Sequence, residues 1–201
     1  MKKTLTLTVL SAFALAVMAQ EQQMDDERLK GLILRQLCSG RVPYMEAGAP
    51  IRPLPTAESI AKAHNISNER MTKVLEEIVR ENLPAIKNGT GRTLNVFPLI
   101  QNMQIFHGTN TVALLKECMA TPLDPIHDSI FRDAVETYVV IAGAESIPFF
   151  REAIENKRLD EKRRSFVYVH LEIATDKLKE KNKTDDVEKI NAFIKEMRQA
   201  E

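Results

Sequence analysis

A template of about 35 residues is written twice in the second half of the chain, and it constrains the fold more than any other feature. GTNTVALLKECM begins at Gly108, and GAESIPFFREAI begins at Gly143, 35 positions later. Each copy follows an apolar stretch with helical spacing and opens with a glycine suited to a turn. One helix pair is too small to bury its own apolar face. The repeat therefore predicts helix pairs that stack on one another and share a core.

The copies predict helices at about 94–106 and 111–119, and again at 126–142 and 146–155. A third, looser copy begins at Arg164 and carries a charged extension, after which an apolar stripe resumes from Val187 to Met197. The equivalent pairs are Val96 and Phe131, Leu99 and Ala134, Ile100 and Val135, Ile105 and Val140, Val112 and Ile147, Leu114-Leu115 and Phe149-Phe150, and Lys116-Glu117 and Arg151-Glu152.

The order of helix, glycine turn and second helix resembles HEAT-like repeats over residues about 93–200. That resemblance implies a short α-α superhelix, or solenoid, which works through an extended surface. A tetratricopeptide array has a similar period, but its Trp, Gly and Tyr signature does not occur here.

The first half of the chain also has the pattern of helices and turns. Asp25 and Asp26 can begin a helix with an apolar stripe from Leu29 to Leu37, and a proline-rich loop follows. Thr56 can cap a helix over 57–64, and a longer helix starts at Ser67. Its apolar face is predicted to consist of Met71, Val74, Leu75, Ile78 and Val79, and Pro84 is expected to end it. No segment alternates with a period of two over the length of a strand, so we predict an all-α fold.

Residues 54–82 outline a helix-turn-helix, and with the preceding LRQLCSGRVP they are similar to the winged-helix module of GntR-type regulators. The resemblance implies that Ser67, Asn68, Arg70, Thr72 and Lys73 would face the major groove. Three observations oppose DNA binding: the leader described below, the net acidic second helix and the missing β-wing after Pro84. We predict no nucleic-acid partner.

The first residues, MKKTLTLTVLSAFALAVMAQ, have the basic start, apolar centre and small residues of a secretory signal peptide. Cleavage after Ala19 would divide the chain into the leader (1–19), a helical module (20–92) and the repeats (93–201). The apolar run is shorter than the ~20 residues of a membrane span, so no stable insertion is expected after cleavage. A periplasmic or extracellular location follows.

Composition limits the classes of partner and the redox chemistry. Lys and Arg number 28, as do Asp and Glu, which gives no overall attraction to nucleic acid or anionic lipid. Cys38 and Cys118 could form one disulfide in an oxidising compartment. Cys118 corresponds to Ala153, a slot for a small buried group, which favours two buried thiols.

No catalytic or cofactor motif stands out in the sequence. Asp124, His127, Asp128 and Asp133 are grouped, but an N-cap and first-turn acids explain Asp124 and Asp128 without a metal. Metal-protease, nucleophile-elbow and phosphate-loop motifs do not occur. His170 aligns with inward-facing Val135 and is expected to lie in the core or a groove. We predict no metal and no cofactor.

The leading functional hypothesis is an exported, non-catalytic protein that binds or scaffolds another protein. Lys116, Glu117, Arg151 and Glu152 occupy equivalent places on the second helices and are candidate binding residues. The alternative is an enzyme, or an enzyme accessory, with a site between helices and His127 or His170 as its titrating group. A DNA-binding regulator is the third hypothesis. The pattern predicts no particular oligomeric state.

Overall fold

The computed structural model describes residues 24–38, 55–87, 96–120 and 128–200, and within them every regular element is helical, which confirms the all-α prediction. The elements are α2 (Asp26–Ile33), a π-helical turn (Leu34–Cys38), α3 (Ala57–Ala63), α4 (Asn68–Lys87), α5 (Phe97–Asn102), α6 (Thr111–Ala120), α7 (Asp128–Ala142), a 3₁₀ turn (Gly143–Ser146), α8 (Ile147–Glu155), α9 (Glu161–Glu180) and α10 (Thr184–Gln199).

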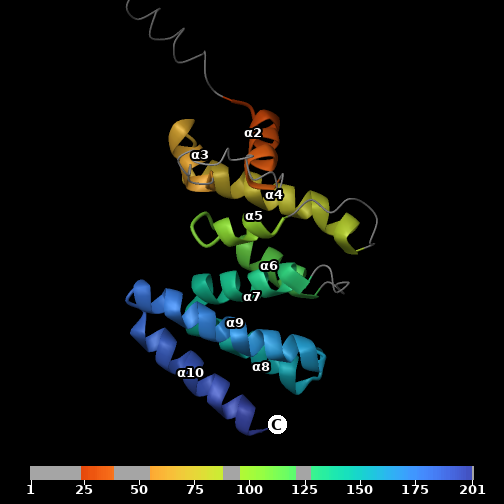
Figure 1. Ribbon diagram of the computed structural model, residues 1–201, viewed down its shortest axis with the longest axis vertical. Helices are drawn as coiled ribbons and strands as arrows, with labels where there is room; N and C mark the ends of the chain where they lie inside the picture. The colour runs from red at the N-terminus through yellow and green to blue at the C-terminus, as the bar shows by residue number, and fades with distance from the viewer. Residues whose placement is uncertain (1–23, 39–54, 88–95, 121–127, 201) are drawn as a thin grey trace, which may run out of the picture.

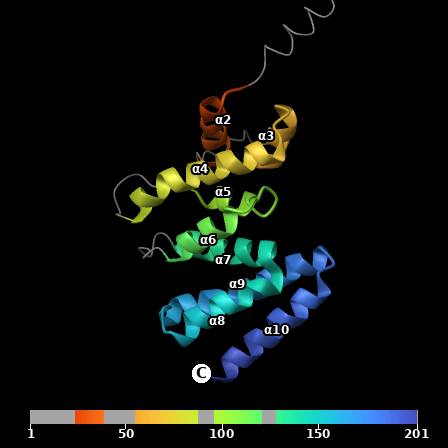
Figure 2. The same ribbon diagram turned by 180° about the vertical axis from the view of Figure 1, so that it is seen from behind.

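The helices follow one another along the long axis of the molecule, with α2, α3 and α4 at one end and α9 and α10 at the other (Figure 1). The first helices of successive units, α5, α7 and α9, pack against one another in that order. Helix α9 lies in front of α8 in Figure 1 and behind it in Figure 2. One apolar cluster extends from α2 to α10. The predicted boundary at residue 92 lies outside the described residues.

Local sequence signals explain where several helices begin. The carboxylate of Asp25 accepts a hydrogen bond from the backbone N–H of Arg28 at 2.7 Å, and Asp160 does the same for Arg163. Thr56 and Ser59 form a reciprocal capping box at the start of α3, as the Thr56 prediction required. The predicted apolar face of α4 is confirmed, because all five of its residues are buried.

Pro84 does not end α4, contrary to the prediction, since the helix continues to Lys87. Proline has no backbone N–H, so the carbonyl of Arg80, four residues earlier, has no helical donor. Pro84 and Arg80 are both exposed, so this carbonyl lies on the side of the helix that faces water. Leu83 is buried and holds this part of the helix on the core. Tertiary packing therefore outweighs the local preference of proline.

The first helix of the first unit is shorter than predicted, because α5 ends at Asn102 and a turn follows. The Asn102 side chain donates to the Pro98 carbonyl at 2.7 Å and accepts from the Ala57 backbone N–H at 3.2 Å. Ile105 consequently does not share the buried environment of Val140, and 54% of its surface is exposed. The expected equivalence of these two positions is wrong.

The 35-residue register does hold between α6 and α8. Thr111 and Ser146 are both buried, and each hydroxyl bonds the backbone of the glycine three residues earlier. Inward positions also agree in burial: Leu115 with Phe150, Cys118 with Ala153, and Met119 with Ile154. Cys38 and Cys118 are buried free thiols, as favoured from the sequence, and burial raises the pKa of Cys38 to about 11.

Candidate functional site

A cavity of about 360 Å³ lies between the first half of α4 and the turn that joins α5 to α6. We call it the junction cavity. Its lining comes from both sides of the predicted division between the helical module and the repeats. The lining residues are Asn68, Glu69, Thr72, Lys73, Glu76, Ile105, His107, Gly108, Thr109 and Asn110.

Hydrogen bonds fix the inner side of the junction cavity. Glu76 is buried and accepts a hydrogen bond from the Thr111 hydroxyl, which in turn accepts from the Gly108 backbone N–H at 2.8 Å. The Thr72 methyl group would lie 3.5 Å from a Cβ atom at position 108, so helix and turn are in close contact. The turn is therefore held against α4 by a carboxylate that tertiary contacts have buried.

The rim of the junction cavity combines apolar and acidic groups. Ile105 presents an exposed apolar side chain, and Glu69 is also exposed. The cation of Lys73 is directed to Asp26 at 3.2 Å and to Glu77 at 3.8 Å. Glu69 is thus the exposed carboxylate of the rim, and Lys73 and His107 also line the cavity.

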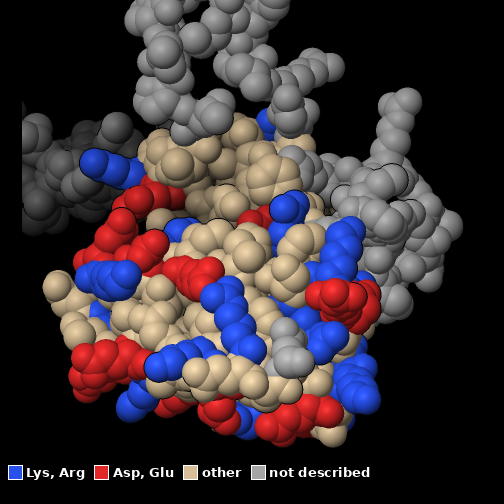
Figure 3. Space-filling view, turned by 60° about the horizontal axis from the view of Figure 1, so that its bottom comes forward, with Lys and Arg blue, Asp and Glu red and all other residues tan. Residues whose placement is uncertain are grey.

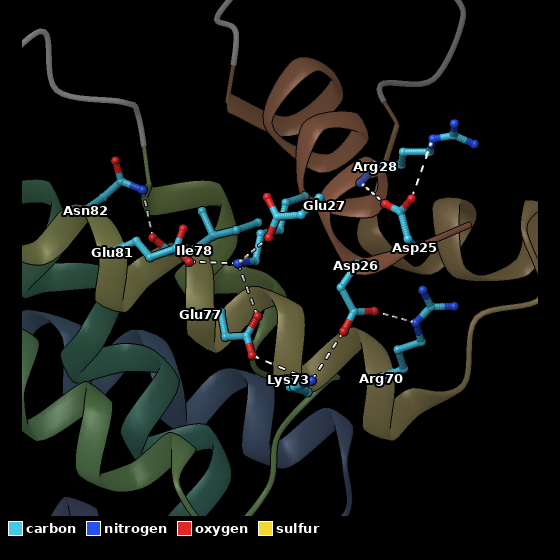
Figure 4. A network of polar contacts seen from close by, with 11 residues as sticks. Asp25, Asp26, Glu27, Arg28, Arg70, Lys73, Glu77, Ile78, Glu81 and Asn82 are labelled. Carbon is cyan, nitrogen blue, oxygen red and sulfur yellow. Dashed lines mark hydrogen bonds and ion pairs between the residues drawn. The ribbon is translucent and has the colours of Figure 1, made fainter. Parts of the chain in front are cut away.

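Ion pairs attach α2 to α4 beside this cavity (Figure 4). Lys30 lies 2.7 Å from Glu81, 3.2 Å from Glu27 and 3.3 Å from Glu77, and these carboxylates raise its pKa. Asp26 lies 2.8 Å from Arg70.

The hydrogen bond from Arg70, followed by that from Lys73, lowers the pKa of Asp26. Glu27, Lys73 and Glu81 are exposed and the other four groups are half-buried. Because solvent screens such pairs, we assign the network to the orientation of α2 more than to stability.

The residues that would enter a DNA groove have other contacts in this structure. Arg70 binds Asp26 and the Met24 carbonyl, and Lys73 also binds Asp26. Asn68 and Thr72 line the junction cavity, where they face the α5–α6 turn. At the opposite end of the molecule, basic and acidic side chains are interspersed on the visible face (Figure 3). A single basic surface, the usual footprint of a nucleic-acid binder, is not seen on that face.

Two of the four predicted binding residues stack on aromatic rings of the next helix pair. The Lys116 ammonium on α6 lies 5.2 Å from the centroid of the Phe149 ring on α8. The Arg151 guanidinium on α8 lies 5.2 Å from the Phe193 ring on α10, and it donates to both carboxylate oxygens of Glu196 at 2.6 and 2.7 Å. Each cation thus lies over an aromatic ring of a later helix, α8 for Lys116 and α10 for Arg151.

The other two predicted binding residues, Glu117 and Glu152, are exposed at equivalent positions. Glu152 lies 3.0 Å from Arg158 in a surface ion pair. The structure therefore places all four residues on one layer of helices, with the cations packed and the carboxylates outward. Their role in binding a partner stays a prediction.

A polar cluster, here the three-helix cluster, joins the first helices. It consists of Gln101 on α5, Gln104 in the turn after α5, Asp133 and Glu136 on α7, and His170 and Lys177 on α9. Glu136 is buried and forms an ion pair with Lys177. Its other oxygen lies 3.4 Å from the His170 Nδ1 atom. Lys177 also donates to Gln104 at 3.2 Å, so a side chain from α9 contacts the turn after α5.

The charge of the three-helix cluster is set by its surroundings. The hydrogen bond with His170, and then those with Lys177 and Gln104, lower the pKa of Glu136 to about 2. Burial raises the pKa of Asp133, which accepts from Gln101 at 3.0 Å. Glu136 is thus held as an anion between helices, where it stabilises their packing.

His170, one of the two predicted titrating groups, lies in the three-helix cluster. His170 is half-buried with a partner, as its alignment with Val135 predicted, but it does not line the junction cavity. Asp124 and His127 lie outside the described residues, and Asp133 belongs to the three-helix cluster. Over the described ranges, no three His, Cys, Asp or Glu side chains converge as metal ligands would. In the same ranges, no helix has the length and apolar character needed to cross a bilayer.

Comparison with protein families, curated proteins and solved structures finds no match to this chain. Sequence reasoning missed Glu76 and Glu136, because each lies in a helix whose pattern suggests a solvent-facing carboxylate. One signal was available: Glu136 stands 35 residues after Gln101, so α5 and α7 carry a polar side chain at equivalent places.

Proposed function

We propose that this chain is an exported, non-catalytic protein that binds or scaffolds another protein in the periplasm or outside the cell. In this proposal the repeats form a short HEAT-like solenoid with a small helical module at its N-terminal end. The repeated burial register of α6 and α8, and the ordered packing of α5, α7 and α9, support the solenoid. The junction cavity, with an exposed isoleucine at its rim, is the observation that carries the binding role.

The chemistry of the junction cavity favours a particular kind of partner segment. Ile105 offers apolar contact and Glu69 offers an exposed carboxylate, whereas Glu76 is buried and bonded to Thr111. A protein segment that presents an apolar side chain next to a lysine or arginine would satisfy both Ile105 and Glu69. Such a segment matches the usual anatomy of an interface, in which a central apolar anchor is surrounded by polar contacts.

The observations give less support to an enzyme or a DNA-binding regulator. The His170–Glu136 contact is the best catalytic candidate, but both groups serve the packing of three helices and no described cavity adjoins them. Arg70 and Lys73, the basic groups of the helix-turn-helix face, are engaged by Asp26.

Export predicts removal of the leader. Expression of the full chain in a bacterial host should yield an envelope-fraction protein whose first residue is Gln20, as measured by intact mass and N-terminal sequencing. Ala19→Phe should block processing, because the peptidase pocket accepts small residues at that place. A cytoplasmic protein that retains residues 1–19 would contradict the export proposal.

Binding at the junction cavity predicts a specific cross-link and a specific loss of affinity. A photo-reactive amino acid at position 109 should trap an envelope protein that the same group at exposed position 113 on α6 does not. Ile105→Asp should then weaken binding of the purified partner by about 10- to 100-fold, the usual effect of losing an apolar anchor. Ala113→Asp is the matched control and should change the dissociation constant less than about twofold. Equal cross-linking at both positions would overturn this assignment.

A further inference from the structure

Helix α9 carries apolar side chains on two opposite faces. Its buried face consists of Val167, Tyr168, Leu171, Ala174, Thr175 and Leu178. With 3.6 residues per turn, the face opposite to Leu171 carries Lys162, Phe166, Val169, Ile173, Asp176 and Glu180, which we call the outer seam. Val169 is 44% exposed and Ile173 is 39% exposed. A helix that covers only one core does not need this second apolar face.

The outer seam has the spacing of a helix–helix contact. Its six positions are separated alternately by four and three residues, which is the pattern that two helices use to pack along one another. Helix α9 lies in front of α8 in Figure 1 and behind it in Figure 2. Val169 and Ile173 are exposed, whereas Phe166 is half-buried against the core. The middle of the seam therefore has the pattern of an interface without a partner among the described helices.

The charges of the outer seam are divided between its ends. Lys162 lies at the N-terminal end, where its ammonium is 5.6 Å from the centroid of the Phe166 ring, and the Arg132 guanidinium is 5.4 Å from the same ring. Asp176 and Glu180 lie at the C-terminal end, and Asp176 is paired with Lys179 at 2.8 Å. Lys162 and Glu180 are thus opposite charges at the two ends of the seam, and Val169 and Ile173 lie between them.

We infer that the occupant of the outer seam is a second copy of this chain, with the two α9 helices antiparallel. A twofold axis midway between positions 169 and 173 places Val169 against the partner's Ile173 and Lys162 against the partner's Glu180. A parallel arrangement would place like charges together at both ends, so charge complementarity selects the antiparallel one.

The dimer is expected to be weak. One helix pair buries less surface than the roughly 1,200 Å² at which stable interfaces begin, so association should appear on the order of 100 µM or above. The inference does not depend on the binding function proposed above, because no seam residue lines the junction cavity. Pairing would give each assembly two such cavities and so increase its avidity for a repeated partner.

Sedimentation velocity over a concentration series of the processed protein tests the dimer. The wild-type protein should show concentration-dependent dimerisation, and Ile173→Glu should reduce the association constant at least tenfold because it buries a charge. Ala113→Glu on α6 is the matched control and should leave association unchanged. Circular dichroism should show equal helicity for all variants, because both positions are exposed. A wild-type protein that remains monomeric at millimolar concentration would overturn the inference.

Charge reversal tests the antiparallel arrangement independently. Lys162→Glu and Glu180→Lys should each weaken association by about three- to tenfold, since the twofold axis repeats each exposed pair. The double variant should regain wild-type association, because the reversed charges face each other again. Failure of the double variant to recover would exclude this pairing, and so would dimers that Ile173→Glu leaves intact.

Discussion

Replacing Gly143 by alanine is expected to lower the free energy of unfolding by about 2–3 kcal/mol. Gly143 has a φ of +57°, which an L side chain rarely adopts. A Cβ atom there would lie 2.4 Å from an oxygen of Asp186 on α10. That carboxylate accepts a hydrogen bond from the Ala144 backbone N–H at 3.1 Å. The aspartate cannot yield to the new methyl group without losing the bond that attaches α10 to the turn.

Urea denaturation of matched glycine variants measures this effect. Gly108→Ala should cost less than about 1 kcal/mol, because its nearest neighbour would lie at an ordinary contact distance of 3.5 Å. Gly31→Ala should stabilise α2 by up to about 1 kcal/mol, since nothing lies within 4 Å of the new Cβ atom and alanine favours helix.

A double-mutant cycle separates the two contributions at the turn. In an Asp186→Ala background, Gly143→Ala should cost only the backbone part of its penalty, about 1–2 kcal/mol, because the clash with the aspartate is absent. An equal penalty in both backgrounds would show that Asp186 does not hold the turn.

Replacing Glu136 by alanine should destabilise the protein by about 3 kcal/mol. The substitution removes the carboxylate that bonds Lys177, Gln104 and His170, and it leaves a void between α7 and α9. This cost is at the low end of the range for removing one partner of a buried ion pair, because 39% of the Lys177 side chain is exposed. Gln101→Ala is the control within the same cluster. It breaks one exposed contact with Asp133 and should cost less than about 1 kcal/mol.

The same carboxylate predicts how stability depends on pH. Its pKa is about 2 in the folded protein and 4.5 when unperturbed, so the folded form binds fewer protons between these values. The stabilisation is therefore complete above pH 4.5 and is lost as the pH falls towards 2. Its size is on the order of 2 kcal/mol after allowance for solvent screening.

Glu136→Gln should remove this pH-dependent stabilisation. The difference in the free energy of unfolding between the wild-type protein and the variant should therefore shrink as the pH falls from 4.5 towards 2. Asp133, whose pKa is raised by burial, contributes with the opposite sign and remains in both proteins. A constant difference from pH 6 to pH 2 would refute the assigned role of Glu136.

Helical class and helix starts could be predicted because their causes are local. Thr56 caps α3 through the backbone of its own first turn, and Asp25 does the same for α2. The apolar face of α4 follows from the 3.6-residue period. The register between α6 and α8 could be predicted for the same reason, since equivalent units bury equivalent faces.

The candidate sites depend on contacts between segments that are distant in the sequence, so they could not be predicted in this way. The acid Glu76 becomes part of the junction cavity only because Thr111 and the α5–α6 turn pack on α4. Lys116 and Arg151 were predicted as binding residues at equivalent places on the second helices. Their contacts with the Phe149 and Phe193 rings depend on how α6, α8 and α10 lie relative to one another.

The sequence by itself therefore determined the helical class, several helix starts, the buried stripe of α4 and the register between α6 and α8, since capping and amphipathic periodicity act within a few residues. Tertiary structure decided that Pro84 stays within a helix, that Ile105 is exposed and that Glu136 is buried. It also decided which apolar face of α9 enters the core. Periodicity identifies two apolar faces on that helix, and only the packing of α7 and α10 against one of them leaves the other in water.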